Sequence, residues 1–219
     1  NRPMVGMFPT FNENEFTPLP KEMIKEELHI DPSSFVCFFG SLSLTDPRRG
    51  MDKLLSALNL FAEKLTLEER AKIVLLIAGR NTHTIVDHLP FKFIDFGIAD
   101  KQRLIQLYNA ATIFICPSIV DPGPSMVNQS LSCGTPVLGY NIGTFKEVVD
   151  KKNTGIVIHD VGNPEALADG IRKFYYMSNS EYRAMSEECR SMAMKTTSYA
   201  AFTKRIDVAY EKYCVKSTQ

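Results

Sequence analysis

Six short apolar runs are the feature of this sequence that most limits how the chain can fold. They lie at residues 35–40, 73–79, 91–97, 112–118, 135–140 and 154–160. Most are continuous hydrophobic stretches rich in β-branched and aromatic residues, which is the pattern of strands buried on both faces. Segments with helical periodicity separate them. This alternation predicts an α/β protein with a doubly wound, Rossmann-like parallel sheet.

The helical segments carry clear periodicity and start signals. Apolar side chains recur at helical spacing in residues 50–65, 100–111 and 163–178. The last forty residues predict two further helices that break near residues 196–198.

Local capping signals mark where three helices should begin. Asp100 is the expected N-cap of one helix, and Asn163 followed by Pro164 is expected to start another. Thr144 and Glu147 have the spacing of a capping box, which predicts a third helix start.

Size and composition point to one large domain. The chain has 219 residues, of which 44% are hydrophobic, so a substantial core is expected. We expect the domain at residues 21–195. The first twenty residues contain four prolines and predict a connecting arm (1–20), while residues 196–219 predict a C-terminal helical extension. The formal net charge is zero, which argues against a nucleic-acid partner.

The cysteines and histidines give no metal or redox signature. Five cysteines are scattered without CxxC spacing, and four histidines are dispersed, so we expect no metal. Cys37 and Cys116 lie in apolar runs and are expected to be core residues. An odd, unpatterned cysteine count indicates a reducing, cytoplasmic setting. The sequence shows no run as long as a membrane span and no signal peptide.

Ligands of doubly wound sheets bind beyond the carboxyl ends of the strands, so the loops there are the candidate site. The first such loop leads from Gly40 through Arg48, Arg49 and Gly50 into a helix. A guanidinium group suits phosphate oxygens, so Arg49 is a candidate phosphate clamp. The alternative is an ordinary solvated arginine.

The second candidate loop, SIVDPGPSMVNQ, follows the run at 112–118. Asp121 lies just beyond the expected strand end. Pro124 favours a helix start, which leaves the N–H groups of Ser125 and Met126 available to an anion. Gln129 lies one helical turn further, where its amide could bond sugar hydroxyls. The alternative is that Asp121 is a turn residue and Gln129 a solvated one.

Several segments together resemble the donor-binding C-terminal half of retaining glycosyltransferases of the GT-B fold (glycosyl transferases group 1, family 4). The resemblance covers most of the chain. It rests on Asn12, Phe16 and Pro18 in NENEFTP, on FFGSLSLTDPRRGMDKLLSAL, on FIDFGIADKQRLIQLYNAATIFICPS, and on SLSCGTPVLGYNIGTFKEVVDKKNTGIVI.

Some positions depart from the family's pattern. The family has two glutamates separated by seven residues, and here Asp121 and Gln129 hold those positions. In the family, the first acid lies by the donor sugar and the second bonds the ribose. Ser41 stands where an arginine often follows the strand glycine, Gly40. The family's Gly-Phe-Gly turn is Pro-Gly-Pro at residues 122–124.

The resemblance implies transfer of a hexose from a nucleotide diphosphate sugar to a polysaccharide or lipid-linked glycan. It implies diphosphate contacts from Arg49 and the amides of Ser125 and Met126, and a base contact from the backbone near Ile98. Gly40 and Ser41, at the end of the first strand, are also expected to contact the donor. It implies that no metal or cofactor is needed. It also implies a separate N-terminal acceptor domain and peripheral association with the inner face of the membrane.

Two other interpretations stay open. The missing glutamate and Ser41 are compatible with a non-catalytic nucleotide-binding or regulatory module that has a degenerate donor site. A nucleotide-sugar epimerase half fits less well, because the loop after CPS follows the transferase pattern.

Overall fold

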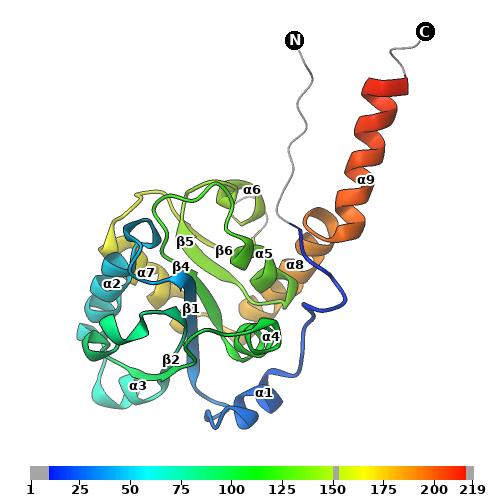
Figure 1. Cartoon of the computed structure of the whole chain (residues 1–219). Helices are drawn as coiled ribbons and strands as arrows, with labels where there is room; N and C mark the ends of the chain where they lie inside the picture. Colours follow the sequence, from blue (N-terminus) through cyan, green and yellow to red (C-terminus); the bar gives the residue numbers. More distant parts are fainter. Residues whose placement is uncertain (1–9, 150–152, 216–219) are drawn as a thin grey trace.

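The computed structural model describes residues 10–149 and 153–215, and its centre is a six-stranded parallel sheet (Figure 1). The strands are β1 (Phe35–Ser43), β2 (Ile73–Arg80), β3 (Lys92–Asp95), β4 (Ile113–Cys116), β5 (Val137–Tyr140) and β6 (Gly155–Ile158). Their order is β3-β2-β1-β4-β5-β6, and every neighbouring pair runs parallel. The predicted doubly wound sheet is therefore confirmed, and its strand order reverses between β1 and β4.

The register between β1 and β4 opens a crevice at that point. The two strands pair only at Cys37 with Ile113 and at Phe38 with Phe114. Beyond Phe38, β1 continues alongside β2, whereas β4 continues alongside β5. The carboxyl ends of β1 and β4 therefore separate, and the loops that follow them can line a site between them.

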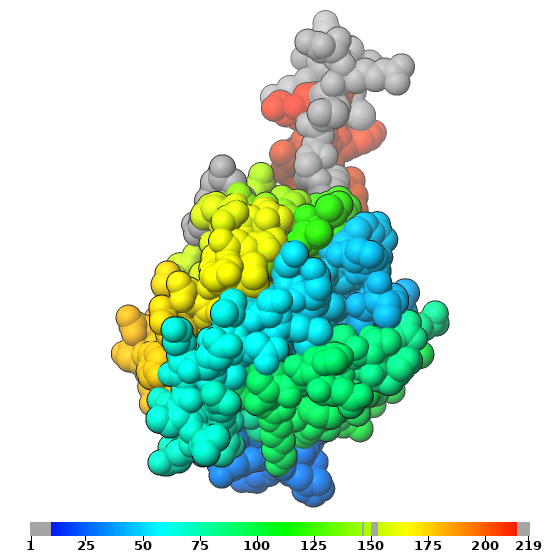
Figure 2. Space-filling view, turned by 90° about the vertical axis from the view of Figure 1, so that its left-hand side faces the viewer, coloured from blue at the N-terminus to red at the C-terminus, as the bar shows by residue number. Residues whose placement is uncertain are grey.

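Helices cover both faces of the sheet. On one face, Cys37 and Phe39 of β1 belong to the core under α2 (Met51–Glu63) and α7 (Pro164–Tyr175). Figure 2 looks onto this side, with α2 in cyan and α7 in yellow. On the other face, Phe38 packs in the core with residues of the helices α1 (Lys21–Glu27), α4 (Lys101–Ala110), α5 (Ser125–Ser132) and α8 (Asn179–Thr196).

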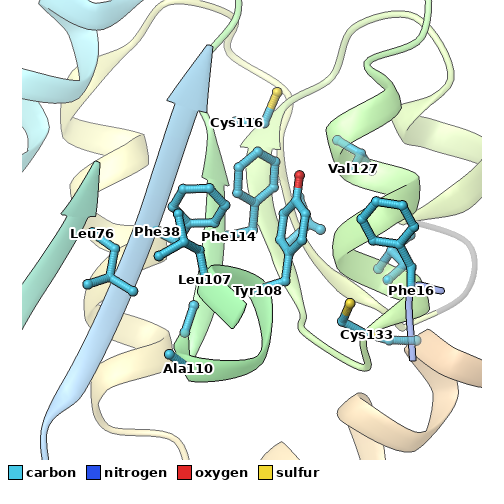
Figure 3. Close-up of a cluster of buried hydrophobic side chains, with 14 of the residues drawn as sticks. Phe16, Phe38, Leu76, Leu107, Tyr108, Ala110, Phe114, Cys116, Val127 and Cys133 are labelled. Atoms are coloured by element: carbon cyan, nitrogen blue, oxygen red, sulfur yellow. The ribbon is translucent and has the colours of Figure 1, made fainter. Parts of the chain in front are cut away.

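An aromatic cluster fixes the second face. The ring of Tyr108 on α4 lies with its centroid 5.1 Å from that of Phe38, 5.5 Å from that of Phe114 and 6.4 Å from that of Phe16 (Figure 3). All four residues are buried. Such edge-on pairs each contribute about 0.5–1.5 kcal/mol beyond their burial. The cluster therefore ties α4 to β1, β4 and the N-terminal arm.

Part of the predicted connecting arm packs onto the domain. Phe11 and Phe16 are buried in the core, and Arg190 Nη1 donates to the main-chain oxygen of Phe16 (2.7 Å). The Glu13 carboxylate accepts the N–H of Tyr199 (3.0 Å), at the start of α9 (Tyr199–Tyr210). Helix α9 leads away from the sheet (Figure 1). Residues 1–9 and 216–219 of the predicted arm and extension lie outside the described residues.

Most local start signals are confirmed. The side chain of Asp100 accepts the N–H of Arg103 (2.8 Å), and that of Asn163 accepts the N–H of Ala166 (3.0 Å). The chain breaks between α8 and α9, as predicted.

The prediction of a capping box at Thr144 and Glu147 is wrong. The helix α6 (Phe145–Val148) does begin there, but Thr144 has φ −86° and ψ 0°, and within the described residues its side chain makes no cap hydrogen bond. An N-cap side chain reaches the first turn from extended backbone, which Thr144 does not have. Three further short helices, which the sequence did not suggest, are α3 (Leu67–Ala71) and the 3-10 helices Thr82–Thr84 and Val86–His88. Within the described residues, no helix is long and apolar enough to cross a membrane.

Lys21, at the start of α1, fastens this helix to the end of α4. Its Nζ donates to the main-chain oxygens of Asn109 (3.0 Å) and Ala111, and lies 5.9 Å from the centroid of the Tyr182 ring. Burial, reinforced by the positive charge of Lys25, lowers the pKa of Lys21 to about 7.

The lowered pKa of Lys21 predicts that the stability of the protein depends on pH. Between pH 7 and the ordinary lysine pKa of about 10.4, the unfolded chain holds a proton that folded Lys21 has lost, so this group makes stability rise with pH. We expect Lys21→Met to remove that component. Urea unfolding of both proteins at pH 7, 8 and 9 should show the wild type gaining stability relative to the variant as the pH rises. Lys64→Met, at an exposed position, controls for the lost charge. A difference between wild type and Lys21→Met that stays constant with pH would contradict the prediction.

Candidate functional site

A cavity of about 290 Å³ opens in the crevice between the carboxyl ends of β1 and β4. Four segments meet there: the end of β1, the loop before α2, the loop after β4, and the first turn of α5. The structure thus brings together six of the predicted site residues, which are Gly40, Ser41, Arg49, Asp121, Ser125 and Met126.

Arg49 and Asp121 form an ion pair on the wall of this cavity. Arg49 Nη1 lies 2.6 Å from Asp121 Oδ2, and the two side chains are 32% and 12% exposed. The other carboxylate oxygen of Asp121 accepts the N–H of Gly123 (2.9 Å). The two residues that the sequence singled out for different parts of the donor therefore contact each other directly.

A close main-chain contact sets this pair. Asp46 caps the short 3-10 helix Pro47–Arg49, and Gly50 follows it in the left-handed conformation, with φ 64°. A Cβ atom at Gly50 would lie 2.0 Å from the main-chain oxygen of Pro117. Beside it, the N–H of Ile119 donates to the main-chain oxygen of Arg48 (2.9 Å). The loop that carries Arg49 is therefore pressed against the loop that leads to Asp121.

A second glycine holds the Asp121 turn from the other side. Gly143, with φ 49°, follows β5, and a Cβ atom there would lie 2.4 Å from the main-chain oxygen of Asp121 and 2.5 Å from that of Pro122. The turn at Asp121 is thus packed between the loops that follow β1 and β5.

The N-terminus of α5 points main-chain donors at the same cavity. Helix α5 begins after Pro124, and the N–H groups of Ser125 and Met126 donate to no acceptor among the described residues. Unbonded amides at a helix start, together with the helix dipole, favour an anion. With Arg49 opposite, the cavity has the chemistry of a phosphate site.

Two predicted residues lie outside this cavity. Ile98 is 69% exposed and lines a neighbouring cavity of about 180 Å³, which shares Ser41, Leu42 and Met126 with the first. Gln129 lines neither cavity, and its Oε1 accepts the hydroxyl hydrogen of buried Tyr108 (3.0 Å).

The sequence reasoning passed over several lining residues. Leu42, 71% exposed, borders both cavities, and buried Ser118 lies on the wall of the first, shortly before Asp121 in the sequence. Leu42 comes just after the apolar run 35–40, and Ser118 ends the run 112–118, so their place at the predicted strand ends could have identified them. Nothing in the spacing indicated that Gly50 contacts Pro117.

The cysteine on the cavity wall is not suited to nucleophilic chemistry. Burial raises the pKa of the Cys116 thiol to about 11, so it stays protonated at neutral pH. Among residues 10–149 and 153–215, no three histidine, cysteine or acidic side chains gather where they could hold a metal ion.

A doubly wound parallel sheet with an anion-accepting cavity at its switch point is the arrangement of nucleotide-binding α/β proteins. The chain belongs to the family Glycosyl transferases group 1, whose model matches residues 21–192.

Individual relatives agree with this assignment. The chain is 25% identical over 162 residues to the alpha-maltose-1-phosphate synthase of Mycolicibacterium smegmatis, which covers 68% of the chain and 40% of that relative. It shares its fold with the sucrose-phosphate synthase of Thermosynechococcus elongatus (TM-score 0.77, 18% identity, 96% of this chain and 52% of that one). It also shares its fold with Anabaena HepE in complex with UDP and glucose (TM-score 0.73, 17% identity, 94% and 56%). The chain thus spans about half the length, or less, of these proteins.

The glycine contact between the two loops can be tested with a matched pair of variants. Gly50 and Gly97 both have positive φ, but of the two only Gly50 is so closely packed that an added Cβ would clash with neighbouring atoms. Gly97→Ala should cost roughly 1–2 kcal/mol of unfolding free energy for backbone strain alone. Gly50→Ala should cost roughly 3 kcal/mol or more, because overpacking is added. Chemical denaturation measures both, and equal costs would show that the Gly50–Pro117 contact is not tight.

Proposed function

We propose that this chain is the donor-binding domain of a retaining glycosyltransferase that moves a hexose from a nucleotide diphosphate sugar to a glycan. The observation that carries the proposal is the meeting of the Arg49 guanidinium and the α5 amides on one cavity, in a chain of the Glycosyl transferases group 1 family. Anabaena HepE, which has the same fold, forms a complex with UDP and glucose, and this supports a nucleotide sugar as the ligand.

In this proposal, each wall of the cavity meets one part of the donor. Arg49 and the N–H groups of Ser125 and Met126 hold the diphosphate and stabilise its charge as it leaves. Asp121 orients the sugar. Gly40 and Ser41 let the donor approach the end of β1. Guanidinium and amides supply the positive charge, so no divalent metal is needed.

The nucleoside would extend toward the second cavity. Backbone near Ile98 would meet the base, because this residue borders the cavity that adjoins the first. Gln129 lines neither cavity and its Oε1 accepts from Tyr108, so its side chain would have to turn toward the donor to bond the ribose.

The donor should bind weakly to this domain alone. A charged hydrogen bond contributes roughly 1.5–3 kcal/mol, a helix N-terminus about 0.3–2, and two neutral ribose bonds about 1 each. The gross sum is roughly 4–7 kcal/mol before ordering costs, and millimolar binding needs about 4. We therefore expect dissociation constants near the millimolar range.

The acceptor would bind elsewhere. We propose a growing polysaccharide or lipid-linked glycan as the acceptor, held by a separate N-terminal domain. We place the protein in the cytoplasm, at the inner face of the membrane when the acceptor is lipid-linked.

The clamp assignment is tested by comparing neighbouring arginines. Arg49 lines the cavity, whereas Arg48 is 64% exposed and pairs with Asp46 outside it. Arg49→Ala should weaken the binding of nucleoside diphosphates roughly tenfold or more, because a charged hydrogen bond is lost. Arg48→Ala should leave binding unchanged. NMR titrations with UDP, GDP and ADP measure both, and equal effects of the two substitutions would refute the clamp.

A non-catalytic binding module is the second candidate. It is favoured by the position of Gln129, which bonds the core tyrosine and lines neither cavity. The two candidate functions predict different effects of the sugar group on binding affinity. A donor domain should bind one nucleotide sugar more tightly than the matching nucleoside diphosphate, whereas a degenerate module should not distinguish them.

The chain by itself should transfer no sugar. The acceptor-binding half would lie in the part of the relatives that this chain does not cover. Incubation of the purified 219-residue chain with labelled nucleotide sugars and glycan acceptors should therefore give no product above a no-protein control. Transfer to an added acceptor would overturn this prediction.

A further inference from the structure

The ion pair on the cavity wall gives Arg49 an anionic partner within the protein itself. One N–H of its guanidinium meets Asp121 Oδ2 at 2.6 Å, on the same cavity that the α5 amides line. We propose that Asp121 is the internal counter-ion of Arg49, which the diphosphate must displace, and that this exchange releases the Asp121 carboxylate toward the sugar. The inference rests on the proposed function, since it takes a diphosphate as the ligand.

The backbone around the pair is held, so the exchange must occur between side chains. Gly50 packs on Pro117, and Gly143 packs on the main chain of Asp121 and Pro122. Neither loop can shift without losing these contacts. The Arg49 side chain, however, is 32% exposed, and a guanidinium carries five donors, so an entering diphosphate can reach it from the cavity before it displaces Asp121.

The charges in the cavity determine whether Asp121 strengthens or weakens the binding of a diphosphate. A diphosphate that approaches Arg49 also approaches the Asp121 carboxylate, which is only 12% exposed and therefore weakly screened. The carboxylate both competes for the guanidinium and repels the phosphate oxygens. Asp121 thus weakens diphosphate binding, although it is a positioning residue for Arg49. A merely structural aspartate would not have this effect.

Asparagine separates the two contacts of Asp121. Its oxygen can still accept the N–H of Gly123, as Oδ1 of Asp121 does at 2.9 Å. Its NH₂ group cannot pair with Arg49. Asp121→Asn therefore removes the counter-ion and keeps the turn. Asp46→Asn is the matched control, because it removes a carboxylate 2.7 Å from the neighbouring Arg48, outside the cavity.

The test is an NMR titration of the 219-residue chain and its variants with pyrophosphate, UDP, GDP and ADP. Asp121→Asn should bind at least one of these diphosphates about three- to tenfold more tightly than the wild type. The gain should become clearly smaller when Arg49→Gln is added, and Asp46→Asn should bind like the wild type. Asp121→Ser, checked with the others for a native spectrum and melting temperature, guards against misfolding of one variant.

The outcomes separate this inference from the proposed function. If the wild type binds a diphosphate and folded Asp121→Asn and Asp121→Ser bind it equally or more weakly, the counter-ion assignment is overturned and the donor site stands. The assignment is also overturned if the gain is undiminished with Arg49→Gln, because repulsion alone would then explain it. If no protein binds any of the four diphosphates, the proposed function fails together with this inference.

Discussion

The close contact between Gly50 and the main chain of Pro117 is the constraint on which the site depends. It presses the loop after β1 against the loop after β4, and the hydrogen bond from Ile119 to Arg48 closes the same junction. Residues 49 and 121 are far apart in the sequence, but this junction places them on one wall. The contact is possible only because Gly50 has no Cβ and adopts positive φ.

The sheet supplies the space in which this junction can form. Because β1 and β4 pair at only two positions, Cys37 and Phe38 on β1, their ends diverge and leave a crevice. The aromatic cluster around Tyr108 holds α4 against both strands below the crevice, and Val127 and Leu131 of α5 are buried in the same core. The helix whose amides face the cavity is therefore set by the packing of the core.

The features that could be predicted from the sequence are those that short-range patterns determine. Alternating apolar runs indicated the parallel sheet, and the carboxyl-end rule brought Arg49 and Asp121 to one edge. These patterns could not show that the Arg49 and Asp121 side chains pair with each other, because the Gly50–Pro117 contact that brings them together is a tertiary one. Thr144 and Glu147 have the sequence pattern of a capping box, but no such cap forms. The packing of Gly143 on the Asp121 turn fixes the backbone just before Thr144. Likewise, helical spacing placed Gln129 correctly along α5, but Tyr108 on α4 takes its oxygen.

Two of the departures from the family's pattern, Ser41 and Gln129, offset each other in charge. The resemblance leads one to expect an arginine after Gly40 and a glutamate at the position of Gln129, and the chain has a neutral residue at both. One positive and one negative charge are thus missing together. The net charge around the cavity is unchanged, with Arg49 balanced by Asp121. A glutamate at 129 without the arginine would add a negative charge one helical turn from the α5 amides and oppose the diphosphate. The neutral amide is therefore consistent with Ser41, and together they leave Arg49 as the cation that the cavity offers to an anion.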